Sequence, residues 1–152
     1  MPIIQYPDIL EMTGEYRFLS NFWSCFIEYK SIHYPSVENA YQAAKMKYDG
    51  DRDRFINIKA SEAKRLGRIY PMRPDWDAVK VSVMKDLVRQ KFKDPKLRER
   101  LLKTGWAKIE EGNYWGDTFW GTVNGEGENH LGKILMEVRE EIFEELKKAE
   151  IK

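Results

Sequence analysis

Apolar side chains recur every three to four residues along several segments of the chain, which is the spacing of one face of an α-helix. The first such stripe follows Ser36 and consists of Val37, Ala40, Tyr41, Ala44 and Tyr48. Ser36 is a good N-cap, because its hydroxyl can accept a hydrogen bond from a free N–H of the first turn. Pro35 disfavours helix in the residue before it. The pattern therefore predicts a helix that begins near residue 36.

The same spacing predicts a short helix over residues 52–57 and further helices that begin near residues 61, 75, 94 and 129. Ser61 is expected to cap the helix at 61. Gly67 is expected to follow its end, where helices often turn into left-handed backbone that glycine adopts freely. Pro95 suits the first position of the helix at 94, because its missing N–H needs no partner there. The last helix has a core stripe formed by Leu131, Ile134, Leu135, Val138, Ile142 and Leu146.

Alternation of apolar and polar residues, the pattern of a half-buried strand, is limited to short stretches. The segments Cys25–Tyr29 and Ile32–Tyr34 flank Lys30-Ser31 and predict a β-hairpin. Further short strands are expected over residues 3–6, 15–18 and 106–110. The chain is therefore expected to adopt an α+β fold. It should be a predominantly helical single domain over residues 1–152 with a small antiparallel sheet from the N-terminal third and the 106–123 region.

Composition narrows the function classes. The 26 Lys and Arg residues nearly balance the 25 Asp and Glu residues, so the chain is not a bulk basic nucleic-acid binder, although a local basic patch would be compatible with this count. The single cysteine, Cys25, lies in an aromatic alternating run, where a buried thiol is more usual than a nucleophile. Two histidines and one cysteine at scattered positions do not have the spacing of metal ligands. No metal and no cofactor are predicted.

The N-terminal segment MPIIQYPDILEM lacks a basic region followed by an apolar core, so it is not expected to be a secretory signal. No apolar run approaches the length of a membrane span. The sequence predicts a soluble cytoplasmic protein without a membrane partner.

Glu38 stands in the first turn of the helix expected at residue 36. A carboxylate there is stabilised by the helix dipole, by less than about 1 kcal/mol at an exposed site, which is the common structural interpretation. Gln42 and Lys45 follow at spacings of four and seven residues, so the three polar side chains share one face. A functional role needs a pocket around the carboxylate. Aromatic residues upstream could supply one: Phe22, Trp23, Phe26 and Tyr34.

Two later stretches carry further candidates. Trp76 and Lys80 lie four residues apart at the start of the helix expected at 75, where the usual interpretation is a core aromatic beside a surface cation. Residues 114–130 combine aromatics, four glycines and Asp117 without a helical or strand period. Glycines let backbone approach a ligand closely, but such loops also simply turn corners.

Five motifs in the chain, in this order, resemble the YbiA-type (NADAR) family of N-glycosidases. They are LSNF, YPSVENAYQAAK, RPDWDAVK, GDTFWG and GENHLGKILMEVRE. The resemblance runs from residue 16 to residue 143. It implies a YbiA-like fold and a metal-independent N-glycosyl hydrolase. One departure is Asn39, where the family often has histidine after the glutamate.

The resemblance implies a catalytic set of Glu38, Trp76 and Asp117. One carboxylate would activate water, the other would stabilise positive charge on the sugar, and the tryptophan would form a platform. The resemblance also suggests residues that hold the ribose and phosphate: Asn21, Phe22, Gln42, Lys45, Lys80, Trp120 and Asn129. The two carboxylates are expected to meet at one hollow walled by tryptophan, with the helices that begin near 36, 76 and 129 around it.

The implied activity is hydrolysis of the N–C1′ bond in phosphorylated N-ribosides, with early pyrimidine intermediates of riboflavin biosynthesis as substrates and ribose 5-phosphate as product. A first alternative is an ADP-ribosyl-guanine hydrolase that acts on nucleic acid. A second is a sensor that binds ADP-ribose-like ligands without catalysis. The balanced charge favours a small phosphorylated metabolite over a duplex, because duplex binding usually leaves a basic stripe on the protein.

Overall fold

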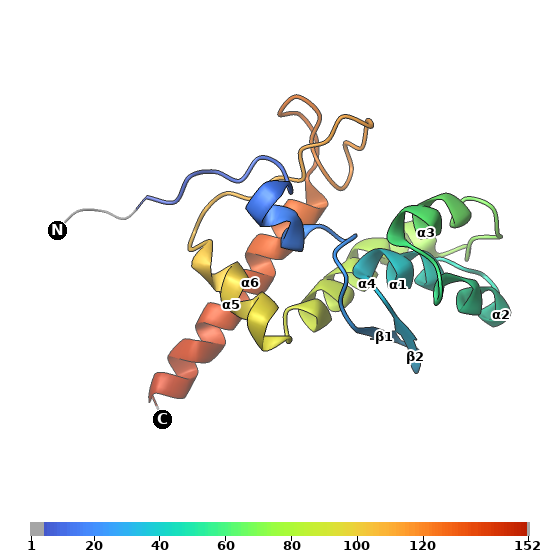
Figure 1. Ribbon diagram of the computed structural model, residues 1–152, viewed down its shortest axis with the longest axis horizontal. Coiled ribbons are helices and arrows are strands. Elements are labelled where there is room, and N and C mark those ends of the chain that lie inside the picture. Colours follow the sequence, from blue (N-terminus) through green and yellow to red (C-terminus); the bar gives the residue numbers. More distant parts are fainter. Residues whose placement is uncertain (1–4, 152) are drawn as a thin grey trace. The chain divides into compact units, whose positions relative to one another are not determined.

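The computed structural model describes residues 5–151, and within them the chain is mostly helical with one small antiparallel sheet (Figure 1). The longer helices are α1 (Val37–Ala44), α3 (Ala60–Leu66), α4 (Trp76–Lys91), α5 (Pro95–Lys103) and α6 (His130–Ile151). The short ones are η1 (Gly14–Leu19), α2 (Asp49–Arg52) and η2 (Asp53–Phe55), and the strands are β1 (Ile27–Tyr29) and β2 (Ile32–Tyr34). The predicted α+β class is confirmed.

The chain divides into two compact units. The first, called the α1 unit, is the continuous segment Asn21–Lys91. The second, called the α6 unit, is built from the segments on either side of it. The single domain expected over residues 1–152 stays a prediction.

Helix α1 is the centre of the α1 unit. It packs against α3, α4 and the β-hairpin (Figure 1), and every one of its eight residues is buried. Ala40, Ala43 and Ala44 have short side chains, which lets neighbouring elements approach the helix closely. Tyr48, expected in the same stripe, is 55% exposed, because the helix ends before it.

The predicted hairpin forms, although its first strand begins at Ile27 and not at Cys25. Tyr34 pairs with Ile27 and Ile32 with Tyr29 in an antiparallel register. Lys30 and Ser31 make the turn with φ of 47° and 67°. Two successive positive φ values give the turn a twist that matches the right-handed twist of the two strands.

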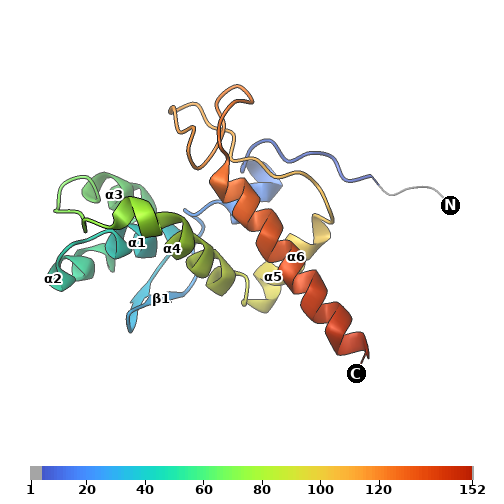
Figure 2. The same cartoon turned by 180° about the vertical axis from the view of Figure 1, so that it is seen from behind.

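Helices α5 and α6 form the core of the α6 unit (Figure 2). Buried Arg139 on α6 donates to the Thr104 hydroxyl at 2.9 Å and to the Ala107 carbonyl at 2.8 Å. These bonds fasten the end of α5 to the middle of α6. The predicted stripe of α6 is buried from Leu131 to Ile142, whereas Leu146 is 42% exposed near the end of the helix.

Several predictions of local structure were wrong. Residues 15–18 lie in the 3-10 helix η1, because the segment is too short for alternation to separate a strand from a tight turn. The 106–110 segment is no strand but carries one parallel bridge between Ile9 and Ile109. In the strand expected over residues 3–6, Gln5 and Tyr6 form no strand, and residues 3 and 4 lie outside the described part.

The caps predicted for α3 were also wrong. Ser61 is the second residue inside α3, and Lys59 is its N-cap. Gly67 does end the helix, but with a φ of −61° its backbone is right-handed. Backbone conformation therefore does not require a glycine at this position.

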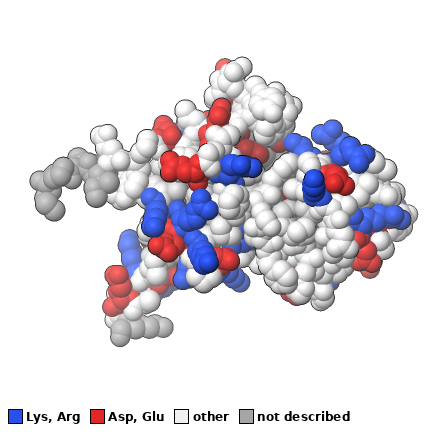
Figure 3. Space-filling model, viewed as in Figure 1, with Lys and Arg blue, Asp and Glu red and all other residues white. Residues whose placement is uncertain are grey.

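The surface carries both charge signs. On the visible face of each unit, Lys and Arg are interspersed with Asp and Glu (Figure 3), as the balanced composition suggests. Across residues 5–151, no helix is both long enough and apolar enough to cross a bilayer.

Candidate active site

The carboxylate of Glu38 is held inside the α1 unit by the way helix α1 begins. Ser36 caps the helix, and its hydroxyl accepts from the Asn39 N–H at 3.0 Å. The Glu38 N–H, another free donor of the first turn, donates to the Asn21 carbonyl at 3.0 Å. With its backbone fixed in this way, Glu38 is only 7% exposed. A surface helix would leave a first-turn carboxylate in water, so burial makes Glu38 more than a partner of the helix dipole.

Gln42 orients the Glu38 side chain. Its Nε2 donates to Glu38 Oε1 at 2.9 Å, as the spacing of four residues on one helix face allows. Because this bond requires the amide nitrogen to face the carboxylate, the amide oxygen of Gln42 faces the other way. That oxygen is buried and has no hydrogen-bond partner among the described residues. Gln42 thus donates a hydrogen bond to Glu38 while its own amide oxygen stays buried without a partner among the described residues, which costs free energy.

The amide oxygen of Gln42 lies against Gly67 at the end of α3. A Cβ added at Gly67 would lie 2.0 Å from Gln42 Oε1 and 2.7 Å from its Cδ. The end of α3 therefore approaches α1 so closely that a larger residue at 67 would displace the Gln42 amide. Gly67 leaves that amide its position, and through Gln42 it affects the position of Glu38.

Three cations, Lys45, Arg68 and Lys80, lie close enough to interact electrostatically at the end of α1. Lys45 is half-buried, and burial lowers the pKa of its ammonium. Arg68 and Lys80 lower the pKa of Lys45 further through their positive charges, while Glu38 raises it. Lys80 also lies 3.3 Å from the Asp77 carboxylate. The sequence-predicted Lys45 therefore interacts electrostatically with both Glu38 and Lys80.

Arg68 was not singled out from the sequence. It lies directly after Gly67, at the end of α3. Nothing in the pattern distinguishes it from Arg65, one turn earlier on the same helix. Only the packing of α3 on α1 shows which of the two arginines acts on Lys45.

Asn21 and Phe22 lie near the first turn of α1. The Asn21 Nδ2 donates to the Met84 sulfur at 3.4 Å, and its Oδ1 is buried without a hydrogen-bond partner in the described structure. Phe22 is 44% exposed. It lines a hollow of 590 Å³ together with Ser36 and Asn39.

Trp76 packs on α1. It is 3% exposed, and its ring centroid lies 5.0 Å from that of Tyr41 at an interplanar angle of 56°. Arg73, just before it, is held by the two oxygens of Asp75 at 2.6 and 2.9 Å. The structure therefore shows Trp76 as an anchor between α4 and α1, and its catalytic role stays a prediction.

Asp117 has a different setting in the α6 unit. Its Oδ1 accepts from the N–H of Phe119 at 3.1 Å and of Trp120 at 2.9 Å. Asn113 holds the same residue from the other side, because its side chain pairs with both the N–H and the carbonyl of Asp117. One carboxylate oxygen of Asp117 thus shapes the turn that carries Trp120.

Asn129 is committed to backbone partners. Its Nδ2 donates to the Ile109 carbonyl at 2.9 Å, and its Oδ1 accepts from the Glu111 N–H at 3.0 Å. These bonds fix the start of α6 against the 109–111 segment. The side-chain amide of Asn129 therefore performs a structural task, and substrate binding by this residue stays a prediction.

The predicted site residues are divided between the two units. Glu38 and the residues around it belong to the α1 unit, whereas Asp117, Trp120 and Asn129 belong to the α6 unit. The meeting of the two carboxylates at one hollow stays a prediction. Within residues 5–151, no group of three or more His, Cys, Asp or Glu side chains is placed to hold a metal ion.

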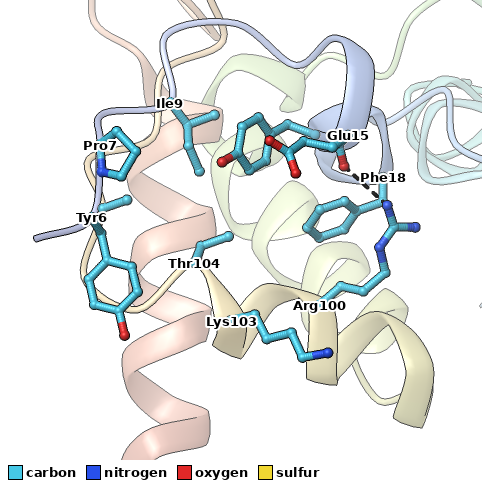
Figure 4. Close-up of a pocket in the computed structure, with 10 residues that line it drawn as sticks. Tyr6, Pro7, Ile9, Glu15, Phe18, Arg100, Lys103 and Thr104 are labelled. Carbon is cyan, nitrogen blue, oxygen red and sulfur yellow. Dashed lines mark hydrogen bonds between the residues drawn. The ribbon is translucent and has the colours of Figure 1, made fainter. Parts of the chain in front are cut away.

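A separate cavity of 210 Å³ in the α6 unit contains none of the predicted site residues (Figure 4). Arg100 lies over the Phe18 ring at 4.3 Å and donates to the Glu15 carbonyl at 3.1 Å. Tyr6 forms another part of the lining.

Residues 10–143 match the NADAR domain family. The chain belongs to this family. The match runs through both units and includes the whole α1 unit. The NADAR match confirms the family resemblance that the five motifs carry.

Named relatives extend this finding. The chain is 42% identical over 137 residues to an N-glycosidase of Nostoc punctiforme, an alignment that covers 84% of this chain and 86% of that protein. It is 39% identical over 139 residues to a riboflavin biosynthesis protein of Vibrio vulnificus. That alignment covers 88% of this chain but only 38% of the Vibrio protein. The chain therefore corresponds to one part of a longer relative.

A solved structure shares the fold. The NMR structure of the Escherichia coli protein YbiA superimposes with a TM-score of 0.80 and 32% sequence identity. The superposition covers 93% of this chain and 89% of YbiA. The YbiA-like fold predicted from the motifs is confirmed.

Proposed function

We propose that this protein is an N-glycosidase that hydrolyses the N–C1′ bond of phosphorylated N-ribosides. The family and the relatives named N-glycosidases support the reaction class. The relatives named riboflavin biosynthesis proteins support early pyrimidine intermediates of that pathway as substrates. The observation that carries the proposal is Glu38, a buried carboxylate oriented by Gln42 beside Lys45.

In this reaction water adds to C1′ and the bond to the base nitrogen breaks. The nitrogen leaves with the bonding electrons and takes up a proton, and ribose 5-phosphate is the second product. The sugar becomes positively charged in the transition state, like an oxocarbenium ion. A fixed carboxylate stabilises that charge far better in a desolvated site than in water. Glu38 is the carboxylate proposed for this task.

The cations around Glu38 have a separate task in the proposal. Positive charge close to C1′ would oppose an oxocarbenium-like transition state, so Lys45 and Lys80 must act elsewhere on the substrate. A phosphate group on the ribose neutralises them and remains unchanged in the reaction. This division explains why a site for cleaving a glycosidic bond contains both a carboxylate and a group of cations.

The test is to incubate the purified chain with the phosphorylated pyrimidine riboside and to measure the ribose 5-phosphate released. Glu38→Gln should lower kcat by 100-fold or more on the scale typical of lost electrostatic stabilisation. Glu145→Gln, which changes an exposed glutamate on α6, is the matched control and should keep full activity. Equal release by wild type and Glu38→Gln would contradict the role given to Glu38.

A second set of substrates separates the alternatives. ADP-ribosylated guanine in single-stranded and duplex DNA should be cleaved more slowly than the riboside if the metabolite is the substrate. Faster cleavage of the DNA would favour the nucleic-acid hydrolase, and binding of ADP-ribose without any cleavage would favour the sensor. A cytoplasmic location stays a prediction.

A further inference from the structure

Lys45 and Arg68 bring two positive charges together where α1 and α3 end. Lys45 is the C-cap of α1, and Arg68 follows Gly67, the C-cap of α3. Gly67 lies against the Gln42 amide. The backbone of the next residue, Arg68, is therefore close to the face of α1 that carries Gln42 and Lys45. The two charges also interact. The positive charge of Arg68 lowers the pKa of Lys45 more than the negative charge of Glu38 raises it.

Among residues 5–151, no Asp or Glu forms an ion pair with Lys45 or Arg68, although the charge of Glu38 does act on Lys45. Other arginines of the same unit are paired: Arg52 with Asp49, Arg54 with Asp51 and Arg73 with Asp75. Lys45 is half-buried whereas Arg68 is exposed, and the positive charge of Arg68 disfavours the charged form of Lys45. Such a pair is favourable when an anion lies between the two groups.

We propose that Lys45 and Arg68 bind the phosphate group of the substrate, and that Arg68 makes the site select phosphorylated over unphosphorylated N-ribosides. This inference rests on the N-glycosidase function proposed above. The guanidinium of Arg68 can form two parallel hydrogen bonds to phosphate oxygens, whereas the ammonium of Lys45 contributes a compact charge. We call Lys45 and Arg68 the phosphate seat. Lys80, which already pairs with Asp77, adds positive charge beside it.

The position of the seat suits a ribose between the phosphate and Glu38. Glu38, Gln42 and Lys45 follow one another on one face of α1 and its C-cap. Seven residues of helix rise about 10 Å, and the long side chain of Lys45 can shorten that distance from its end of the helix. The sugar would then lie between Glu38 and the two cations, with C1′ towards Glu38 and the phosphate towards Arg68.

The experiment compares two substrates and one ligand in three proteins: wild type, Arg68→Gln and Arg65→Gln. Arg65 is also exposed and lies one turn earlier on α3, which makes it the matched control. For the phosphorylated riboside, Arg68→Gln should lower kcat/KM by about 10-fold to 100-fold, the usual cost of losing charge-assisted hydrogen bonds. For the unphosphorylated riboside the change should stay within about twofold, because no phosphate contact is lost. Arg65→Gln should match wild type on both, and Arg68→Lys should recover part of the preference.

Binding of ribose 5-phosphate, measured by calorimetry, gives a readout that does not depend on turnover. Its affinity should fall by about tenfold or more in Arg68→Gln and stay unchanged in Arg65→Gln. If wild type hydrolyses neither riboside, the proposed function fails, but loss of ribose 5-phosphate binding in Arg68→Gln would still support the phosphate seat. Equal loss of kcat/KM on both substrates, or unchanged ribose 5-phosphate binding in Arg68→Gln, would overturn the inference.

Discussion

The two candidate carboxylates of this protein lie in opposite settings. Glu38 in the α1 unit is buried and receives a hydrogen bond from a side chain, Gln42. Asp117 in the α6 unit is only half-buried, and one of its oxygens accepts from two backbone N–H groups. The α1 unit holds a carboxylate away from water, as the proposed catalytic role requires, whereas one carboxylate oxygen of Asp117 maintains the shape of the 113–120 loop. Two acidic residues implied by one family resemblance therefore need different tests.

The largest expected effect is the loss of kcat when Glu38 or Asp117 is replaced by its amide. Glu38→Gln should lose kcat by 100-fold or more, whereas Asp117→Asn should lose about 10-fold to 100-fold if its free oxygen contacts the reacting atoms as the family resemblance implies. Asparagine keeps an acceptor oxygen and caps backbone N–H groups about as well as aspartate does, so the loop should keep its shape. Steady-state rates and melting temperatures of both variants provide the measurement. Full activity in Asp117→Asn would assign Asp117 a structural role alone.

A smaller effect is expected at Gly67, which never touches the substrate in this scheme. A Cβ there collides with the end of the Gln42 side chain, so Gly67→Ala should displace the amide and loosen Glu38. We expect kcat to fall about tenfold with little change in KM, because orientation of the carboxylate is lost rather than binding.

The double variant Gly67→Ala/Gln42→Ala is the control for that prediction. Once the Gln42 amide is gone, the tightest contact left to the added methyl group is the Ala63 carbonyl oxygen at 3.3 Å, which a small shift relieves. The two substitutions should therefore be strongly non-additive, with the double variant no slower than Gln42→Ala alone. Additive losses would show that Gly67 acts on the fold by a route other than Gln42.

The smallest expected effect concerns stability. Asp117→Ala removes the acceptor for two backbone N–H groups, which should lower the free energy of unfolding by about 1 kcal/mol, the usual cost of losing such a cap. Asp117→Asn should leave the free energy of unfolding nearly unchanged. Urea unfolding of the two variants measures the difference. A similar loss in both would show that the charge of Asp117, and not its acceptor oxygen, stabilises the turn.

Much of the fold was accessible from the sequence. The helical stripes of α1 and α6, the cap at Ser36, the proline start of α5 and the hairpin around Lys30-Ser31 all follow from local rules. The errors fell where segments were short, as in η1 and the single bridge at Ile109, because few residues cannot distinguish one periodicity from another.

The candidate site was predicted less completely. Spacing alone indicated that Glu38, Gln42 and Lys45 share a face of α1. It could not show that this face is buried, because burial depends on how closely α3 and α4 pack against it. Gly67 and Arg68 were missed for the same reason, since the residues that they affect, Gln42 and Lys45, are distant from them in sequence.

By itself the sequence determined the helices, the hairpin, the family and the identity of the acidic candidates, because these depend on periodicity, capping and motif order along a local stretch. Only the tertiary structure decided that Glu38 is desolvated, that a glycine at 67 makes room for Gln42, and that Arg68 rather than Arg65 acts on Lys45. Burial and electrostatic coupling depend on distances between elements, and those distances are set only when α3 and α4 pack onto α1.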